Sequence, residues 1–411
     1  MRPPLPEGPY LVVGLARSGI AAARMLRDHG EVIGTDSGSP EVHGDLDARL
    51  GVDGVELLDR VACVVKSPGV PNEAPVIARA RERGLPVLGE LELAWRLLAN
   101  PFVAVTGTNG KTTTTELLGA IWGEADMPVA LAGNVGTPLA ALVGEVDEST
   151  TIVCEVSSFQ AEDSEAFAPD TAVLLNVTED HLDRHGTFDA YRDAKLRVFA
   201  NQTPQQVAVV PPGVEVPGSA RRIEFGELPL PAEEIRLRGA HNLENAMAAS
   251  AAALAAGVPK EAVAAALRSF RGVPHRLEEV GSVGGVLYVN DSKATNVSSA
   301  VRGIEAFDGG VHVILGGSLK GGGFEGLRDA VASRCVAAYL IGEAAERLER
   351  DLGPVGVELR RCADLADAVR AAAADAAPGE VALLSPACAS FDQFRDYEER
   401  GEAFRSLVPQ G

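Results

Sequence analysis

The stretch that decides the fold is Phe102-Val103-Ala104-Val105-Thr106 followed by Gly107-Thr108-Asn109-Gly110-Lys111-Thr112. The first five residues predict a buried strand, and the two glycines predict a tight turn into a helix that begins at Lys111. In this context backbone N–H groups and a helix N-terminus can cradle phosphates. Lys111 can neutralise β- and γ-phosphate charge, and the Thr112 hydroxyl can ligate Mg²⁺. The turn is shorter than the general P-loop, whose first glycine would fall on Val105. We interpret it as an ATP site; the alternative is a glycine-rich turn with an incidental lysine.

Strand-like and helix-like patterns alternate on both sides of this turn, which predicts a parallel α/β architecture. Strands are expected at 10–13, 32–35, 62–65, 87–88, 102–106, 152–156, 172–176, 287–290, 311–315, 338–341 and 381–384, and helices at 19–28, from 111, and at 242–256. Loop signals at Asn100-Pro101 and at Gly272-Val273-Pro274 divide the chain. We predict three domains: a Rossmann-like N-terminal domain (1–92), a central P-loop ATPase-like domain with a mostly parallel sheet (93–271), and a C-terminal Rossmann-like α/β domain (272–411).

The bulk composition limits the classes of function. Hydrophobic residues make up 46% and charged residues 23% of the chain, which is typical of globular proteins. No run approaches the roughly 20 apolar residues that a membrane span needs, and Arg17 and Ser18 interrupt the first apolar stretch. A cytoplasmic location is therefore expected. The formal net charge of −21 argues against binding to nucleic acid or to anionic membranes. An anionic small substrate would need a local cluster of cations.

The cysteines do not suggest a site. The five are scattered without a CxxC spacing, so neither a disulfide framework nor a zinc site is expected. Cys63 and Cys154 lie in strand-like apolar runs, where cysteine behaves as a small hydrophobic residue.

Two acidic segments follow predicted strands. Glu155 ends the strand at 152–156, and a carboxylate at the carboxyl end of a parallel strand points into the crevice where ligands bind. The loop at 177–185 is dense with acidic and histidine side chains. Carboxylate oxygens are preferred ligands of Mg²⁺, so both segments are candidates for the metal of a nucleotide site. Spacing alone does not decide which residue contacts the metal.

The N-terminal unit contains an imperfect dinucleotide fingerprint, Gly14-Leu15-Ala16-Arg17-Ser18-Gly19. Ala16 replaces the second glycine, which normally lets a pyrophosphate approach closely. Asp36 ends the next strand, where a ribose-binding acid is expected. The residues leave two ligands open, a nicotinamide dinucleotide or a UDP-sugar. Both contain a diphosphate, which would bind a helix N-terminus, and hydroxyl groups, which would bind an acidic side chain.

Eight blocks together resemble the Mur ligases over nearly the whole chain. They are GTNGKT (107–112), EVSSFQ (155–160), NVTEDHLDRH (176–185), AKLRVF (194–199), HNLENAMAA (241–249), PHRLE (274–278), NDSKATN (290–296) and SPACASFDQF (385–394). Their order matches the order in that family. The last block and the Rossmann-like start resemble the members that add D-glutamate to UDP-N-acetylmuramoyl-L-alanine.

The resemblance implies ATP and Mg²⁺, with two metal ions, as cofactors. The implied ATP-binding residues are Gly107, Thr108, Asn109, Gly110, Lys111, Thr112, Thr113, Asn242, Asn245, His275, Arg276, Asp291 and Lys293. The implied metal ligands are Thr112, Glu155, His181 and a carbamylated Lys195, and the catalytic set is Lys111, Glu155, His181 and Lys195. By its pattern alone, Lys195 would be a helix-surface lysine. Asn242 and Asn245 lie three residues apart on one helical face, so both can reach the same ligand.

The two acceptor substrates are assigned by the same resemblance. The UDP-substrate would contact Arg17, Ser18, Asp36, Ser37, Gly69, Asn134, Ser157 and His181, and D-glutamate would contact Thr295, Lys320, Ser390 and Tyr397. One departure is Ser318, where relatives often carry aspartate ahead of the pocket lysine. An anionic substrate of this acidic protein needs a local cluster of cations. The resemblance implies such a cluster, made of Lys111, Arg276, Lys293 and Lys320.

The implied function is an ATP-dependent amide ligase of peptidoglycan precursor synthesis, which forms an acyl phosphate and releases ADP and phosphate. A monomer is expected, with small-molecule substrates only. The alternatives are a ligase that adds a diamino acid, a ligase that extends folate with glutamate, an NAD-dependent enzyme built on the first domain, and a P-loop regulatory ATPase. The last would release phosphate without any acceptor.

Overall fold

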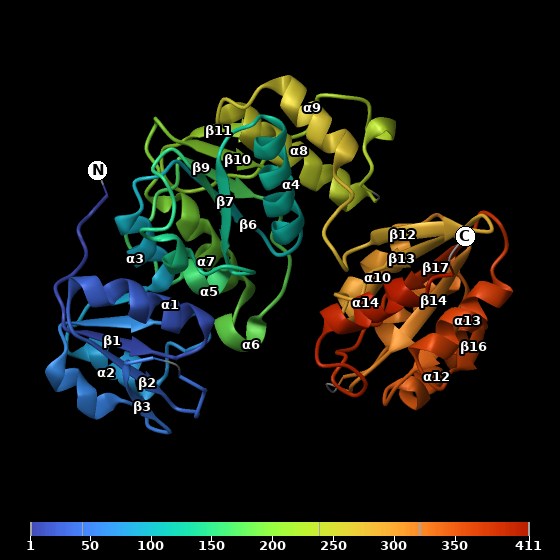
Figure 1. Cartoon of the computed structure of the whole chain (residues 1–411), viewed down its shortest axis with the longest axis horizontal. Helices are drawn as coiled ribbons and strands as arrows, with labels where there is room; N and C mark the ends of the chain where they lie inside the picture. The colour runs from blue at the N-terminus through green and yellow to red at the C-terminus, as the bar shows by residue number, and fades with distance from the viewer. Residues whose placement is uncertain (1, 43, 238, 320–321, 410–411) are drawn as a thin grey trace. The chain divides into compact units, whose positions relative to one another are not determined.

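The computed structural model describes residues 2–42, 44–237, 239–319 and 322–409, and it contains three sheets (Figure 1). The chain divides into two compact units, residues 1–234 with 244–268, and residues 235–243 with 269–411. The first unit contains two sheets and the second unit one, so the prediction of three α/β domains is confirmed. The predicted domain boundaries stay a prediction.

The first sheet has the order β3-β2-β1-β4-β5, and every described pair in it is parallel. Its strands are β1 (Tyr10–Val13), β2 (Val32–Asp36), β3 (Asp47–Leu50), β4 (Cys63–Lys66) and β5 (Val87–Gly89). Its helices are α1 (Arg17–Leu26), η1 (Arg27–His29), η2 (Val55–Arg60), α2 (Pro75–Glu82) and α3 (Glu90–Leu97). Apolar residues of η2 and α2 pack on one face, and those of α1 and α3 pack on the other.

The second sheet, also parallel, has the order β11-β10-β9-β6-β8-β7. Its strands are β6 (Phe102–Thr106), β7 (Val129–Gly133), β8 (Thr151–Glu155), β9 (Thr171–Leu174), β10 (Val207–Val210) and β11 (Arg221–Glu224). Its helices are α4 (Lys111–Glu124), η3 (Leu139–Leu142), α5 (Ser158–Ala161), α6 (Leu182–His185), α7 (Phe188–Ala200), η4 (Ala232–Glu234), α8 (Ala240–Ala255) and α9 (Lys260–Ser269). Trp95 of α3 contacts Phe167 edge-on at 5.6 Å between ring centroids, and one apolar core runs from the first sheet into the second. This shared core explains why the two sheets form one unit.

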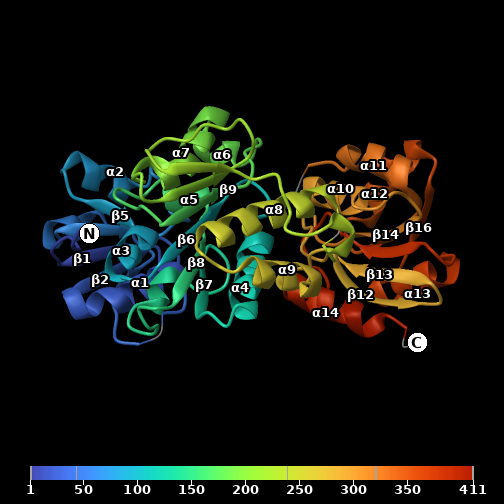
Figure 2. The same ribbon diagram turned by 90° about the horizontal axis from the view of Figure 1, so that it is seen from above.

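The third sheet has the order β12-β13-β17-β14-β15-β16 and is parallel except for the β12–β13 hairpin. Its strands are β12 (Glu278–Val283), β13 (Val286–Asn290), β14 (Val311–Gly316), β15 (Cys335–Ile341), β16 (Glu358–Arg361) and β17 (Val381–Leu384). Its helices are α10 (Val297–Glu305), η5 (Glu325–Leu327), α11 (Arg328–Arg334), α12 (Ala345–Leu352), η6 (Gly353–Val355), α13 (Leu365–Asp375) and α14 (Tyr397–Leu407). Helices α10, α11 and α12 cover one face, and α13 and α14 cover the other (Figure 2).

Candidate active site

The glycine turn joins β6 to α4 at the carboxyl end of a central strand. Gly107 and Gly110 have φ values of 155° and 85°, in the region that favours glycine. A Cβ on Gly110 would lie 2.1 Å from Oδ1 of Asn245, and one on Gly107 would lie 3.0 Å from Cβ of Leu175. The turn therefore packs tightly between α8 and the segment after β9, with no space for side chains at either position.

The backbone and the lysine of this turn are held in place. Thr108 N donates to Asn176 O at 3.0 Å, and Asn109 N donates to Asn176 Oδ1 at 2.9 Å. Lys111 Nζ donates to the carbonyls of Gly107 and Thr108 at 2.9 and 3.0 Å. The ammonium group thus lies over the turn, at the N-terminus of a 14-residue helix, which is an arrangement that favours an anion.

Glu155 lies at the end of β8, next to β6, and is buried. Its Oε2 accepts from the Thr112 hydroxyl at 2.8 Å, and its Oε1 accepts from the Asn134 amide at 2.9 Å. Three of the predicted residues therefore meet at one carboxylate, with Thr112 in the first turn of α4. A hydroxyl and a carboxylate within hydrogen-bonding distance provide oxygen donors suited to Mg²⁺.

Lys195 is buried on α7, so the interpretation of its pattern as a helix-surface lysine is wrong. Its Nζ donates to Gly107 O at 2.8 Å and lies 4.5 Å from the centroid of the Tyr191 ring. Lys111 binds the same carbonyl. Burial first, and the nearby Lys111 charge second, lower the pKa of Lys195 to about 7. A substantial fraction of this amine is therefore neutral near pH 7.

His181 directly precedes α6 and His185 is its last residue, and the two have different surroundings. His181 is exposed, has a φ of 51°, and packs edge-on against Phe159 at 4.9 Å. His185 is mostly buried, stacks on Phe159 at 5.4 Å, and its Nε2 lies 3.0 Å from Ser158 Oγ. Burial lowers the pKa of His185. Across the described residues, no group of three or more His, Cys, Asp or Glu side chains is placed to hold a metal ion by itself.

In the first domain, the fingerprint turn packs against two neighbouring segments. A Cβ on Gly19 would lie 1.9 Å from Gly14 O, so the third position of the fingerprint has space only for glycine. Asp36 Oδ2 accepts from Leu15 N at 2.7 Å, and Ser67 Oγ donates to Gly14 O at 2.6 Å. The ends of β2 and β4 therefore both hold the turn at the N-terminus of α1.

The other predicted UDP-site residues lie near this turn or around Glu155. Arg17, Ser37 and Gly69 are exposed, and Ser18 is half-buried. Ser157 caps α5 through Gln160, so part of its hydrogen-bonding capacity is used by the helix.

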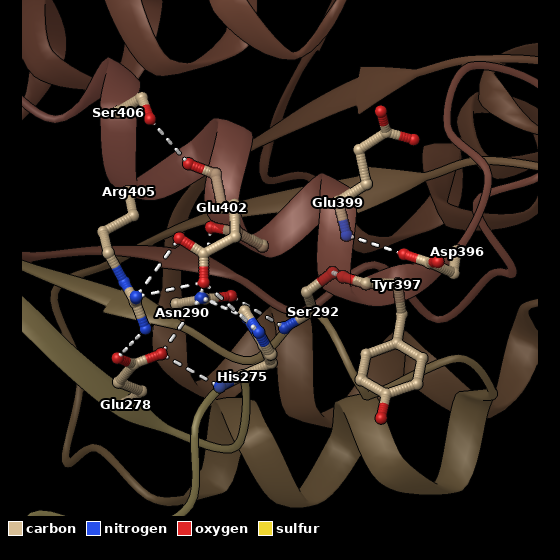
Figure 3. A network of polar contacts seen from close by, with 11 residues as sticks. His275, Glu278, Asn290, Ser292, Asp396, Tyr397, Glu399, Glu402, Arg405 and Ser406 are labelled. Carbon is tan, nitrogen blue, oxygen red and sulfur yellow. Dashed lines mark hydrogen bonds and ion pairs between the residues drawn. The ribbon is translucent and has the colours of Figure 1, made fainter.

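In the second unit, His275 lies inside a polar network with β12, β13 and α14 (Figure 3). Its backbone N donates to Glu278 Oε2 at 2.9 Å, and its Nδ1 lies 3.0 Å from the Asn290 amide. Nε2 lies 3.6 Å from Glu402, and a Cβ on Gly401 would lie 2.1 Å from Nδ1. This packing fixes a residue whose φ is 63°.

Asp291 and Lys293 follow β13 as predicted. Asp291 is buried, and its Oδ2 accepts from Ser385 Oγ at 2.7 Å. Burial raises the pKa of Asp291 to about 7, against the opposing effects of the Ser385 hydrogen bond and of nearby arginines. Lys293 Nζ lies 4.9 Å from the centroid of the Tyr397 ring. Lys293, which is predicted to bind ATP, therefore lies beside Tyr397, which is predicted to bind D-glutamate.

The loops predicted to hold D-glutamate meet at the carboxyl ends of β14 and β17. Ser318 N donates to Ala389 O at 2.9 Å, so the loop that leads to Lys320 pairs with the loop that carries Ser390. Ser390 is buried. Lys320 itself lies outside the described residues. Ser318, the departure from the family pattern, exchanges hydrogen bonds with Asp392, whose N donates to Ser318 Oγ at 2.8 Å.

Comparison with known proteins shows the family of this chain. Residues 105–217 match the family model described as the Mur ligase middle domain, and residues 275–388 match the Mur ligase glutamate ligase domain. A protein of Acidobacterium capsulatum named UDP-N-acetylmuramoylalanine--D-glutamate ligase is 43% identical, over 97% of this chain and 95% of the relative. The chain belongs to the Mur ligase family. A protein of the same name from Anaeromyxobacter dehalogenans is 44% identical over 97% of each chain.

Solved structures of Mur ligases share the fold at low sequence identity. A MurF ligase from Thermotoga maritima in complex with ADP has a TM-score of 0.59 and 18% identity, over 98% of this chain and 94% of the other. A UDP-N-acetylmuramate-alanine ligase, also from Thermotoga maritima, has a TM-score of 0.55 and 17% identity, over 97% and 99%. Both support the fold of this Mur ligase, and neither by itself specifies its acceptor.

The sequence reasoning missed an ion cluster where the first two domains of this Mur ligase meet. Lys66 ends β4 and is fully buried; its Nζ lies 2.5 Å from Asp163 Oδ2 and 3.1 Å from Glu162 Oε1. Arg184 donates to Glu162 Oε1 at 2.8 Å and to Val70 O at 2.7 Å. The cluster therefore links the loop after β4, which carries Gly69, to helix α6 beside His181.

The sequence reasoning also missed Arg400, which is 1% exposed. It lies one turn after Tyr397 on α14, and its guanidinium binds the last residue of β14 and the segments after β13 and β17. Its partners lie between 11 and 108 residues away in the sequence.

Cys63 and Cys154 are buried within strands, and burial raises the pKa of both thiols, that of Cys63 to about 12. Within the described part of the chain, no helix has the length and apolar character that crossing a membrane requires.

Proposed function

We propose that this Mur ligase joins D-glutamate to UDP-N-acetylmuramoyl-L-alanine and converts ATP to ADP and phosphate. Near full-length relatives at 43% and 44% identity carry the name of that activity. The observation that carries the proposal is the glycine turn: its two glycines have no space for a Cβ, and Lys111 binds the carbonyls of Gly107 and Thr108 beside the Thr112–Glu155 pair.

The turn and its surroundings would bind ATP. Thr108 N and Asn109 N donate to Asn176, so the backbone N–H groups at the N-terminus of α4, from Gly110 to Thr113, and the Lys111 ammonium would bind the phosphates. Asn245 packs directly on Gly110. His275, Arg276, Asp291 and Lys293 of the second unit, and Asn242 of α8, would be further nucleotide-binding residues.

The donors present fit Mg²⁺, because Thr112 and Glu155 place a hydroxyl and a carboxylate beside the turn. His181 and a carbamate on Lys195 would complete the set. Mg²⁺, when bound, would neutralise charge on the phosphates and on the transferring phosphoryl group.

Carbamylation of Lys195 is supported by its environment. The neutral amine attacks CO₂, a C–N bond forms, one proton is released, and the product is an anionic carbamate. A pKa near 7 leaves enough neutral amine for this step, whereas an ordinary lysine near pH 7 is almost fully protonated. The carbamate would also replace a cation that now lies beside the Lys111 cation on one carbonyl.

The uridine diphosphate end of the acceptor would bind the first domain through Arg17, Ser18, Asp36, Ser37 and Gly69. The helix α1 N-terminus would receive the diphosphate. The muramoyl end of the acceptor would reach Asn134, Ser157 and His181, which lie on the segments beside Glu155.

The proposed chemistry has two steps. The L-alanyl carboxylate attacks the γ-phosphorus of ATP, and the bond to the bridging oxygen breaks, which gives an acyl phosphate and ADP. The D-glutamate amine then attacks the acyl carbon, phosphate leaves with the C–O electron pair, and the amine loses a proton. Lys111 would stabilise the transferring phosphoryl group, and Thr295, Lys320, Ser390 and Tyr397 would orient the amino acid. Positioning of the reactants and electrostatic stabilisation supply most of the acceleration.

A panel of acceptor amino acids tests the proposal. Phosphate release is measured with UDP-N-acetylmuramoyl-L-alanine, ATP and Mg²⁺ while D-glutamate, L-glutamate, L-lysine or diaminopimelate is supplied in turn. We expect turnover with D-glutamate. Turnover only with a diamino acid would replace the acceptor assignment, and phosphate release without any acceptor would favour a regulatory ATPase.

We further propose a cytoplasmic monomer that acts on small molecules. The net charge of −21 disfavours nucleic acid and anionic membranes as partners. Light scattering at micromolar concentration would test the oligomeric state.

A further inference from the structure

The buried side chain of Arg400 forms hydrogen bonds at the start of three loops of the C-terminal unit. Its Nη2 donates to Ser292 O at 2.8 Å and to Cys388 O at 3.1 Å. Its Nη1 donates to Ala389 O at 3.2 Å and reaches Gly316 O at 3.5 Å. Nε donates to Ser292 Oγ at 3.0 Å. The planar fork of an arginine can engage several acceptors at once in a fixed geometry, which a lysine cannot reproduce.

These acceptors lie at the carboxyl ends of three neighbouring strands. β13, β17 and β14 are adjacent in the sheet and parallel, so the segments that follow them lie at one edge. In open α/β sheets, ligands bind outside this edge. Arg400 therefore binds the backbone on which an acceptor site of the C-terminal unit would be built.

Each of the three loops also carries a residue assigned to the amino acid. Ser390 follows Ala389 directly, Thr295 lies three residues after Ser292, and the loop after Gly316 leads to Lys320. The fourth assigned residue, Tyr397, lies one turn before Arg400 on α14, and Ser292 Oγ donates to its carbonyl at 2.8 Å (Figure 3). A single side chain thus contacts all of the loops that would hold the acceptor.

The charge of Arg400 also bears on an anionic acceptor. In the part of the chain that the structure describes, its hydrogen bonds go to carbonyl and hydroxyl oxygens, and none goes to a carboxylate. Burial lowers the pKa of Arg400 to about 10, so the group stays protonated near pH 7. Asp392 is the acid whose charge acts on it. A buried cation with neutral ligands leaves positive potential at the strand ends, which favours a dicarboxylate.

We infer that Arg400 is a positioning residue for the acceptor amino acid: it sets the spacing of the three loops and adds positive potential behind them. The inference rests on the proposed function for the identity of the acceptor. A purely structural role would lower stability without selectively weakening recognition of the amino acid.

Kinetics of three variants separate the two roles. Arg400→Lys keeps the charge and loses the fork, and Arg400→Met loses both. Arg334→Met is the matched control, because Arg334 Nη1 also donates to a carbonyl, that of Asp308 at 2.7 Å, which lies before β14 at the opposite end of the sheet. The assay follows ADP formation with saturating UDP-N-acetylmuramoyl-L-alanine.

We expect Arg400→Lys to raise the KM for D-glutamate roughly 10- to 100-fold, which is the effect of a misplacement on the ångström scale. Arg400→Met should raise it further, since the potential is also lost. The KM for ATP should rise several-fold less than the KM for D-glutamate in both variants, because only the Ser292 loop also carries the proposed ATP-binding residues Asp291 and Lys293. Arg334→Met should leave both KM values unchanged. A KM for D-glutamate within twofold of wild type in folded Arg400→Lys would overturn the inference, and so would a parallel rise in both KM values.

Hydrogen exchange supplies a readout that does not depend on activity. The amides of Ser318 and Gly316, bonded to Ala389 O and Pro386 O, should exchange at least tenfold faster in Arg400→Lys than in the wild type. Unchanged protection would also refute the inference. If the wild-type protein forms no ADP with D-glutamate, the proposed function fails, while the exchange experiment still decides whether Arg400 holds the loops.

Discussion

Replacing Lys66 by methionine should destabilise the first unit, because this side chain neutralises a pocket that holds two acids. Lys66 is fully buried, and the carboxyl groups of Asp163 and Glu162 are 1% and 12% exposed. Methionine has a similar length and leaves no large cavity. The change therefore isolates the loss of the cation from the loss of packing.

The size of the effect follows from the burial of Asp163. Burial raises the pKa of Asp163 even though Lys66 opposes the shift. Removal of one partner from a buried pair costs about 3–5 kcal/mol of unfolding free energy, because an uncompensated charge remains. Without Lys66 the folded-state pKa of Asp163 rises further. The penalty should then be smaller at acidic pH, where more of the acid is protonated, than at pH 8, since the stability from a raised pKa is lost as the pH rises through it.

Urea unfolding followed by tryptophan fluorescence measures this effect, because Trp95 and Trp122 both lie in the first unit. Lys66→Met with Asp163→Asn should recover at least about half of the loss, since the more buried acid is then neutral and Glu162 keeps its ion pair with Arg184. Lys260→Met, at an exposed position, is the control and should stay within about 0.5 kcal/mol of wild type. A loss below about 1 kcal/mol in Lys66→Met, or no recovery in the double variant, would refute this account of the cluster.

Three further predictions follow from single sites. Gly110→Ala should reduce kcat/KM for ATP at least 100-fold in the ADP assay, because the new Cβ would lie 2.1 Å from Asn245 Oδ1 at a φ of 85°. A wild-type rate in this variant would contradict the account of the turn. Glu90→Gln should flatten the pH dependence of the unfolding free energy. Burial raises the pKa of Glu90 to about 7, so the stability that its protonated form contributes is complete below about pH 4.5 and is lost as the pH rises through 7. The difference between the two limits is roughly 3 kcal/mol. Identical wild-type and variant profiles from pH 4 to 8 would contradict it. Wild-type protein in ¹³C-bicarbonate should show a carbamate carbon resonance near pH 8 that weakens below pH 7, as Lys195 becomes protonated, and that is absent in Lys195→Ala.

The central strands were predictable because they are buried on both faces and appear as short apolar runs. The prediction for 102–106 matches β6, and the predictions for 10–13 and 381–384 match β1 and β17. Of the six edge strands in the described residues, five were missed, namely β3, β7, β11, β12 and β16. β3, β11 and β16 are largely exposed and rich in charged residues, so no period-2 apolar pattern marks them.

Two missed strands did leave a signal in the sequence. Gly284-Gly285, with φ values of 59° and 82°, joins β12 to β13, and a Gly-Gly pair between alternating residues is a hairpin signal. The apolar run at 207–210 is short but continuous, and it forms β10. Both could have been predicted from local sequence.

The site was predictable where it is local. The glycine turn, Lys111 and Thr112 lie within six residues, and Glu155 follows from its place at a strand end. Long-range packing was not predictable: Lys66 meets its partners 96 and 97 residues away, and only the packing of α7 against the turn shows that Lys195 is buried. The roles assigned to the acceptor-site residues stay predictions.

Buried basic side chains lie at the carboxyl ends of strands in all three sheets, and the partners of each one decide whether it can favour an anionic ligand. Lys66 is paired with Asp163 and Glu162, so its charge is cancelled within that cluster. Lys195 is partly neutral near pH 7 and would become an anion as the proposed carbamate. Arg400 binds carbonyl and hydroxyl oxygens and is 1% exposed, so its charge can act on a ligand at the strand ends of the third sheet and is screened weakly by salt. Neutralising surface acids should therefore change the affinity for the proposed dicarboxylate much less than Arg400→Met does.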